Sequence, residues 1–118
     1  IASFVHFAHN AEYLAEYPNL PASLTRVQVY AVWVGTAALG VLGYGLLLKR
    51  RQLLGLGVLA VYAAIGFDGL LHYTRAPLAA HTGTMNLTIW SEVVAAALAL
   101  AAVLALWIEE GRGRAPAR

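Results

Sequence analysis

The chain of 118 residues is 60% hydrophobic and only 12% charged, whereas an ordinary soluble domain has about 25% charged residues. Its formal net charge is +2, and the basic residues flank apolar runs, so the charge does not indicate nucleic-acid binding. The absence of cysteine excludes disulfides, thiolate metal sites and thiol redox chemistry.

The first predicted element is a helix formed by "IASFVHFAHNAEYLAEY", residues 1–17. It is too short and too polar to cross a membrane alone, so we interpret it as the last part of a truncated first helix that begins upstream. Residues 17–23 contain two prolines and an asparagine, a composition typical of a break between helices. Ser23 or Thr25 then caps the next helix.

Three apolar runs follow, at residues 27–48, 53–71 and 87–108. A helix needs about 20 mostly apolar residues to cross the hydrocarbon core, and each run comes close to that length. We therefore predict an all-α integral membrane bundle of four helices, with three clear transmembrane spans and the N-terminal helix. This bundle forms a single domain over residues 1–110, followed by a disordered basic tail at 111–118.

The distribution of positive charge predicts the orientation of the bundle. Of the eight Lys and Arg residues, three lie in the short loop 48–53 and three lie in the C-terminal tail. Loops rich in Lys and Arg stay in the cytoplasm, so we expect the C-terminus there, in a bacterial inner membrane. Residues 10–26 and 74–86 then face the exterior.

Small residues within the spans predict close helix packing, because glycine and alanine let helix backbones approach in lipid. They are Gly35, Gly40, Gly43, Gly45, Gly55, Gly57, Gly66 and Gly69 in the second and third helices, and Ala95, Ala96 and Ala99 in the last.

Ionisable side chains inside the helices gather toward the predicted exterior ends. At about 1.5 Å rise per residue, Asp68 lies about 6 Å and Glu92 about 9 Å below those ends. A charged residue deep in a span costs about 2.5–3.5 kcal/mol on insertion scales, and such residues usually pair with a partner or bind a ligand. His6, His9 and Asn10 share one face of the first helix, so three helices can direct polar groups into one volume.

Asp68, His72 and His81 form the sharpest constellation, since an Asp and a His four residues apart on a helix can ligate one ion that a loop histidine completes. Imidazole and carboxylate ligands suit copper, zinc or iron. His6, His9 and Glu92 are further candidate ligands or surrounding groups. Alternatively, Asp68 forms an ion pair with Arg75 or Arg26, and the histidines only hold the helix ends together. Met85 is a candidate soft ligand for copper, although a lone methionine more often serves packing.

The segment "DGLLHYTRAPLAAHTGTMNLTIWSEV" resembles the copper-site helix and loop of the C subunit of particulate methane and ammonia monooxygenases. The matching residues are Asp68, Gly69, His72 and His81, within about 25 of the 118 residues. The resemblance implies copper near the exterior membrane face. The spacing between the two histidines is shorter than in that family, and this chain has fewer spans.

Four functions remain open from the sequence. The first is a small membrane metalloprotein that binds copper or zinc, with iron as a further candidate, and functions in redox chemistry or metal handling. The second is a non-catalytic accessory subunit of a homo-oligomer or larger membrane complex. The third is a haem b protein, with His72 and a histidine of the first helix as axial ligands. The fourth is a metal-free lipid isomerase or hydrolase that uses His and Glu as acid and base. The sequence assigns no substrate and no catalytic residue.

Overall fold

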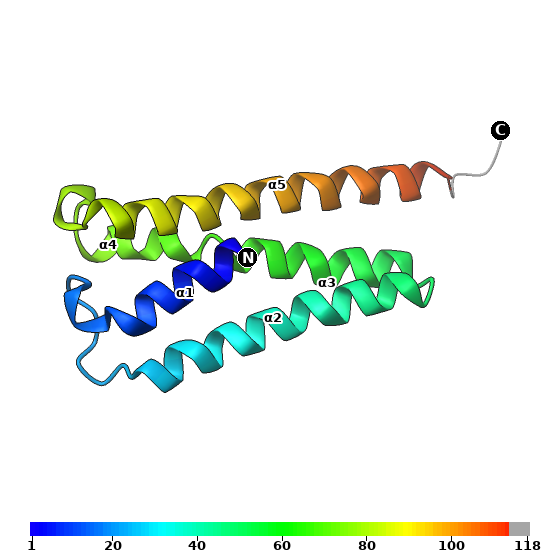
Figure 1. The fold of residues 1–118 in the computed structure, drawn as a ribbon. Helices are drawn as coiled ribbons and strands as arrows, with labels where there is room; N and C mark the ends of the chain where they lie inside the picture. The colour runs from blue at the N-terminus through cyan, green and yellow to red at the C-terminus, as the bar shows by residue number, and fades with distance from the viewer. Residues whose placement is uncertain (114–118) are drawn as a thin grey trace.

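The computed structural model describes residues 1–113, and every regular element among those residues is helical (Figure 1). The α-helices are α1 (Ala2–Glu12), α2 (Arg26–Leu48), α3 (Gln52–Ile65), α4 (His72–Arg75) and α5 (Gly83–Gly113), and the 3₁₀ turns are Leu14–Glu16, Asp68–Leu71 and Leu78–Ala80. Helix α2 packs on α3, α3 packs on α5, and α1 packs against both α5 and α2.

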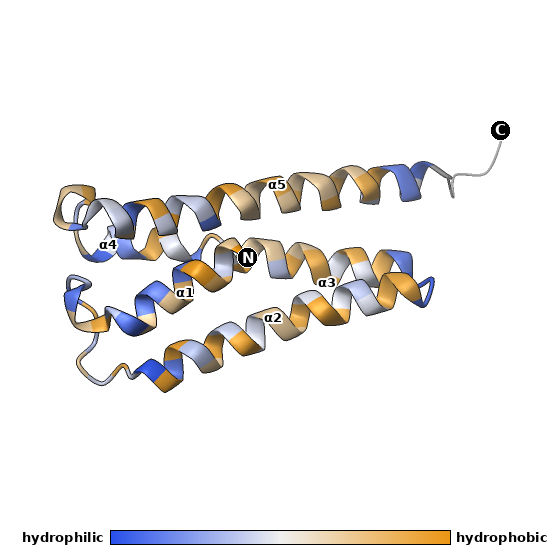
Figure 2. Cartoon of the chain, viewed as in Figure 1, coloured by the Kyte–Doolittle hydropathy of each residue, from blue (hydrophilic) through white to orange (hydrophobic). Residues whose placement is uncertain are grey.

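Three helical segments are long and apolar enough to cross a membrane, which confirms the predicted spans. They are Arg26–Leu48, Gln52–Arg75 taken through its turn, and Gly83–Arg112, with mean hydropathies of 1.8, 1.9 and 2.2. Figure 2 shows that hydrophobic residues dominate the middle of the three long helices and hydrophilic residues collect toward their ends. Val41 and Leu98 are 73% and 68% exposed, as expected for side chains that face lipid.

The start of α2 shows how the sequence ends one helix and begins the next. Thr25, rather than Ser23, is the N-cap: its side chain accepts a hydrogen bond from the Gln28 backbone N–H, and the Gln28 side chain accepts one from the Thr25 backbone N–H. This reciprocal pair satisfies two donors that the first helical turn leaves free. The cap fixes where α2 starts, next to the C-terminal end of α1.

The third span is not one continuous α-helix. Helix α3 ends at Ile65, Gly66 and Phe67 form a turn, and Asp68–Leu71 follows as a 3₁₀ helix before α4. A 3₁₀ helix turns about 120° per residue, and an α-helix about 100°. Four 3₁₀ steps therefore leave Asp68 and His72 about 120° apart around the axis, whereas the predicted α-helix leaves them about 40° apart.

Helices α1 and α5 lie at the two ends of the described part of the chain. Helix α1 has 11 residues and lies beside the half of the bundle that contains α4 (Figure 1). Helix α5 continues to Gly113, three residues into the segment predicted as a disordered tail, and residues 114–118 lie outside the described part of the chain.

Candidate functional site

Side chains from four regions of the chain meet at the end of the bundle that contains α4. We call the following residues the polar cluster: His6 and Asn10 from α1, Asp68 and His72 from the end of the third span, His81 from the following loop, and Glu92 from α5. His6, His72, His81 and Glu92 are all less than 9% exposed. The structure thus brings together five of the six predicted site residues, and Asn10 with them.

His6 and Glu92 form the innermost pair of the cluster. Each residue is 2% exposed, and His6 Nε2 lies 3.6 Å from Glu92 Oε2. The Thr88 hydroxyl donates to the Met85 carbonyl oxygen at 3.0 Å, so His6 Nδ1, 3.5 Å from that hydroxyl oxygen, carries the hydrogen. In a neutral imidazole Nε2 is then an acceptor, and it faces a second acceptor on Glu92. A proton or a cation between the two atoms would turn this repulsive contact into an attractive one.

Asn10 connects the two histidines nearest the pair. Its Nδ2 lies 3.4 Å from His6 Nε2 and 3.0 Å from His72 Nε2, so one amide group can donate to both imidazoles. Its Oδ1 is buried and has no hydrogen-bond partner. With the amide turned over, that oxygen would accept hydrogen bonds from two protonated nitrogens. Asn10 can therefore serve either protonation state of the histidine pair.

His72 lies between two other histidines. Its ring centroid is 5.5 Å from that of His6 and 6.1 Å from that of His81, and both pairs are nearly perpendicular. His81 Nδ1 donates to the Pro77 carbonyl oxygen at 3.1 Å, which leaves Nε2 as a bare acceptor in the neutral ring. A backbone partner of this kind is what commonly orients a metal-ligating histidine.

Several buried polar atoms of the cluster have no hydrogen-bond partner. They are Asn10 Oδ1, Asp68 Oδ1, His72 Nδ1, His81 Nε2 and Glu92 Oε2. Each unsatisfied buried polar group costs about 1–3 kcal/mol, and native structures contain few of them. All five belong to the polar cluster, where an ion, a water molecule or another polar ligand would satisfy them.

His9 stands apart from the cluster, although it lies on the same helix as His6. Its Nδ1 is 2.8 Å from the Tyr17 hydroxyl, and its ring stacks on Tyr13 at 4.6 Å between centroids. Burial raises the pKa of Tyr17 to about 12, and the tautomer of His9 decides which of the two groups donates in this hydrogen bond. The imidazole therefore helps to hold the loop after α1.

The neighbours of the cluster bear on two interpretations from the sequence, the ion pair of Asp68 with Arg26 and Met85 as a metal ligand. Arg26 lies 3.4 Å from Glu12 at the surface, not beside Asp68. Met85 is 1% exposed, belongs to an apolar core group with Tyr17, and its sulfur accepts the Thr82 backbone N–H at 3.5 Å. The burial of Met85 and its place in the apolar core group favour a packing role for this residue.

A cavity of about 200 Å³ opens beside the cluster, and its polar lining consists of His6, Asn10, Asp68, His72 and Arg75. Within residues 1–113, no three His, Asp or Glu side chains lie close enough together to hold an ion as they stand. Any metal coordinated by three of these side chains must therefore draw at least one of them inward.

Asn10 is the member of the polar cluster that the candidate ligand set omitted. Its spacing of four residues from His6 placed it on the same helical face, which was the available signal. Its contact with His72, 62 positions away in the chain, could come only from the fold.

A comparison of this chain with protein-family models, with curated proteins and with solved structures finds no significant match. The geometry of the polar cluster is therefore the basis for the function proposed below.

Proposed function

We propose that this protein is a small membrane metalloprotein that binds one transition-metal ion, zinc or copper, at the polar cluster. His6, His72 and Glu92 are the proposed ligands, and Asn10, Asp68 and His81 surround them. The observation that carries the proposal is the His6–Glu92 pair, in which an imidazole nitrogen faces a carboxylate oxygen at 3.6 Å inside the bundle.

That separation is close to what one ion needs. Zinc binds imidazole nitrogen and carboxylate oxygen at about 2.0–2.2 Å with tetrahedral angles, which puts two ligand atoms about 3.3 Å apart. Placing two imidazole rings on the same ion puts their centroids about 5 Å apart. The His6 and His72 centroids are 5.5 Å apart, so both pairs are within about half an ångström of these values.

His72 is the ligand that has to move. Its Nε2 is hydrogen-bonded to Asn10 at 3.0 Å, and its Nδ1 has no partner. Turning toward an ion between His6 and Glu92 would exchange the Asn10 contact for a metal bond. Asp68, whose Oδ1 is also unpartnered, lines the same cavity as His72 and can orient it from the other side.

The donor set agrees with all the metals that the sequence left open. Two imidazoles and a carboxylate suit zinc, copper or iron, and exclude a preference for calcium or magnesium, which take oxygen ligands. Two imidazoles and a carboxyl group, from His6, His72 and Asp68, line the cavity of about 200 Å³ beside the cluster, which suits a single ion. The local resemblance to a copper-site segment supports copper, and the charge distribution supports a site in the exterior leaflet.

Titration of chelator-stripped protein with Zn²⁺ and with Cu²⁺, followed by calorimetry, tests this proposal. Wild type should bind one ion, and His6→Ala, His72→Ala and Glu92→Gln should each lose most of the affinity. Asp68→Asn and His81→Ala should weaken binding by about 10- to 100-fold, the effect usual for residues that orient ligands.

His9→Ala is the matched control, because it removes a histidine from the same helix without touching the cluster. It should bind metal like wild type. If wild type binds no more metal than His72→Ala, the metal proposal fails. The alternative is then an accessory subunit in which the polar cluster only holds the helices together.

A further inference from the structure

The connection between α2 and α3 places three basic residues at one end of the bundle. We call Lys49, Arg50 and Arg51 the basic turn, and all three are exposed. The Arg50 backbone N–H donates to the Leu47 carbonyl oxygen at 2.9 Å, and the Arg51 backbone N–H donates to the Leu46 carbonyl oxygen at 2.9 Å. This pair of bonds is the Schellman motif, which ends many helices. The three charges are therefore carried by a hydrogen-bonded turn.

Arg50 has a backbone conformation that favours glycine. Its φ is 57°, in the left-handed region, where a side chain costs free energy through its Cβ atom. Glycine is the usual residue at this position of the motif, yet none of the glycines within residues 1–113 has a positive φ. The positive charge at position 50 is thus present despite a conformational cost. Backbone strain of this kind is a reason to look for a function.

The helices on either side of the basic turn are in close contact. A Cβ atom on Gly55 would lie 2.7 Å from Leu47 Cδ2 and 3.0 Å from the Gly43 carbonyl oxygen. Because the helices come this close, three residues are enough to connect them. The three positive charges are therefore concentrated within a small area.

The surroundings of the basic turn are apolar, and its charges are not neutralised by neighbouring side chains. Within residues 1–113 the ion pairs join α1 to α5 and α1 to α2, so the basic turn has no carboxylate partner there. Leu48 and Leu54, just before and just after the turn, are 68% and 54% exposed. Since both lie in the membrane-spanning segments, they face lipid. A ligand with a negative charge next to an apolar chain matches this surface.

We propose that the basic turn binds the headgroup of an anionic phospholipid, whose acyl chains lie against Leu48 and Leu54. Phosphate oxygens accept charge-assisted hydrogen bonds from Arg and Lys. Each basic residue next to a membrane span strengthens the attraction of anionic lipid by about fivefold.

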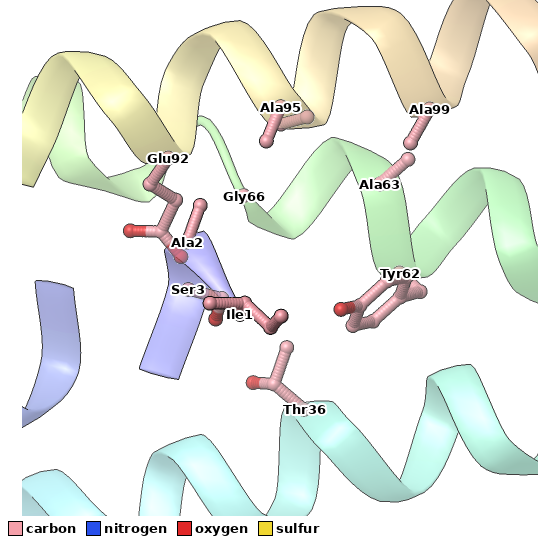
Figure 3. A pocket seen from close by; sticks show the side chains of 11 residues that line it. Ile1, Ala2, Ser3, Thr36, Tyr62, Ala63, Gly66, Glu92, Ala95 and Ala99 are labelled. Atoms are coloured by element: carbon pink, nitrogen blue, oxygen red, sulfur yellow. The ribbon is translucent and has the colours of Figure 1, made fainter. Parts of the chain in front are cut away.

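The basic turn is separate from the polar cluster. The α2–α3 connection and α4 lie at opposite ends of the bundle (Figure 1). Side chains between these ends are mostly small or apolar, for example Ala63, Ala95 and Ala99 (Figure 3). Lipid binding at the basic turn therefore does not depend on the proposed metal centre.

Quenching of Trp107 fluorescence by brominated phospholipids tests the proposal. Trp107 is 38% exposed, and its ring lies beside Gly57, about 9 Å along α3 from Arg51 at 1.5 Å per residue. With Trp33→Phe and Trp90→Phe in every variant, Trp107 is the only tryptophan. Brominated phosphatidylglycerol should show a binding constant at least about fivefold higher than brominated phosphatidylcholine. Vesicles with the same lipids in both leaflets make the result independent of orientation.

Variants at position 50 separate the charge from the backbone conformation. Arg50→Gln should lower the preference for the anionic lipid by about threefold to fivefold, whereas Arg50→Lys, which keeps the charge, should retain most of it. Arg26→Gln is the matched control, because it removes one positive charge at the other end of α2, and it should behave like wild type. Arg50→Gly should also lose the preference, yet its melting temperature should be no lower than that of wild type, which shows that the fold is intact.

The proposal is overturned if wild type shows no preference, or if Arg50→Gln and Arg26→Gln change it equally. It is also overturned if inorganic phosphate removes the preference at constant ionic strength, because the ligand would then be a soluble phosphate rather than a lipid.

Discussion

Alanine at position 66 should push α3 and α5 apart. Its Cβ would lie 2.7 Å from Ala96 Cβ and 3.3 Å from the Ala63 carbonyl oxygen. Carbon atoms in contact prefer about 3.5–4.0 Å, so the helices would have to separate by about 1 Å. Gly66 has φ −65° and ψ 0°, which alanine adopts readily, so the effect is steric rather than conformational. Overpacking of this kind costs about 1–3 kcal/mol.

Reversible unfolding in mixed micelles would measure the change in the free energy of unfolding. Gly35→Ala is the control, because no atom lies within 4 Å of its added Cβ and alanine favours a helix by about 0.5–1 kcal/mol. Combining Gly66→Ala with Ala96→Gly leaves a single methyl group at this contact. The double variant should therefore lose less free energy of unfolding than the two single variants together. The reasoning fails if Gly66→Ala is as stable as Gly35→Ala, or if the two effects simply add.

Three further predictions follow from the ends of the helices. A reporter fused after Arg118 should read cytoplasmic and one inserted near Ala79 should read exterior; the reverse pair of signals would invert the proposed orientation. Thr25→Ala should lower the free energy of unfolding by about 1 kcal/mol through loss of the α2 cap, measured in the same micelles, and an unchanged value would contradict the cap. Tyr17, with its pKa raised from 10.0 to about 12, keeps its proton in the folded chain after the unfolded chain has lost it, so stability should fall as pH rises between these values. Tyr17→Phe should lack that part of the fall in a series of melting temperatures, and an identical pH dependence would rule it out.

The membrane spans could be predicted from the sequence because length and hydropathy determine them almost alone. The break in the third span could not. Residues 53–71 are uniformly apolar up to Asp68, and Gly66, where the helix turns, packs closely against Ala96. That contact joins positions 30 residues apart, so no local pattern contains it.

The polar cluster was predictable in its membership but not in its pairing. Depth along each helix placed His6, Asp68 and Glu92 in the exterior half of the predicted bundle, and the structure brings them to one end of it. The expected core of Asp68, His72 and His81 assumed an α-helix between Asp68 and His72. The 3₁₀ turn rotates those two residues apart, while the packing of α1 on α5 brings His6 to Glu92. The centre of the proposed site is therefore displaced toward α1.

X-ray absorption at the zinc edge of the loaded protein tests the metal site most directly, because it reports the ligands themselves. The proposal predicts nitrogen and oxygen neighbours at about 2.0–2.2 Å, with the outer-shell scattering of two imidazole rings. In His72→Ala one of those rings should disappear, and in His9→Ala both should remain. A shell of water or carboxylate oxygens without imidazole, or the same two rings in His72→Ala, would contradict a metal centre built on His6, His72 and Glu92.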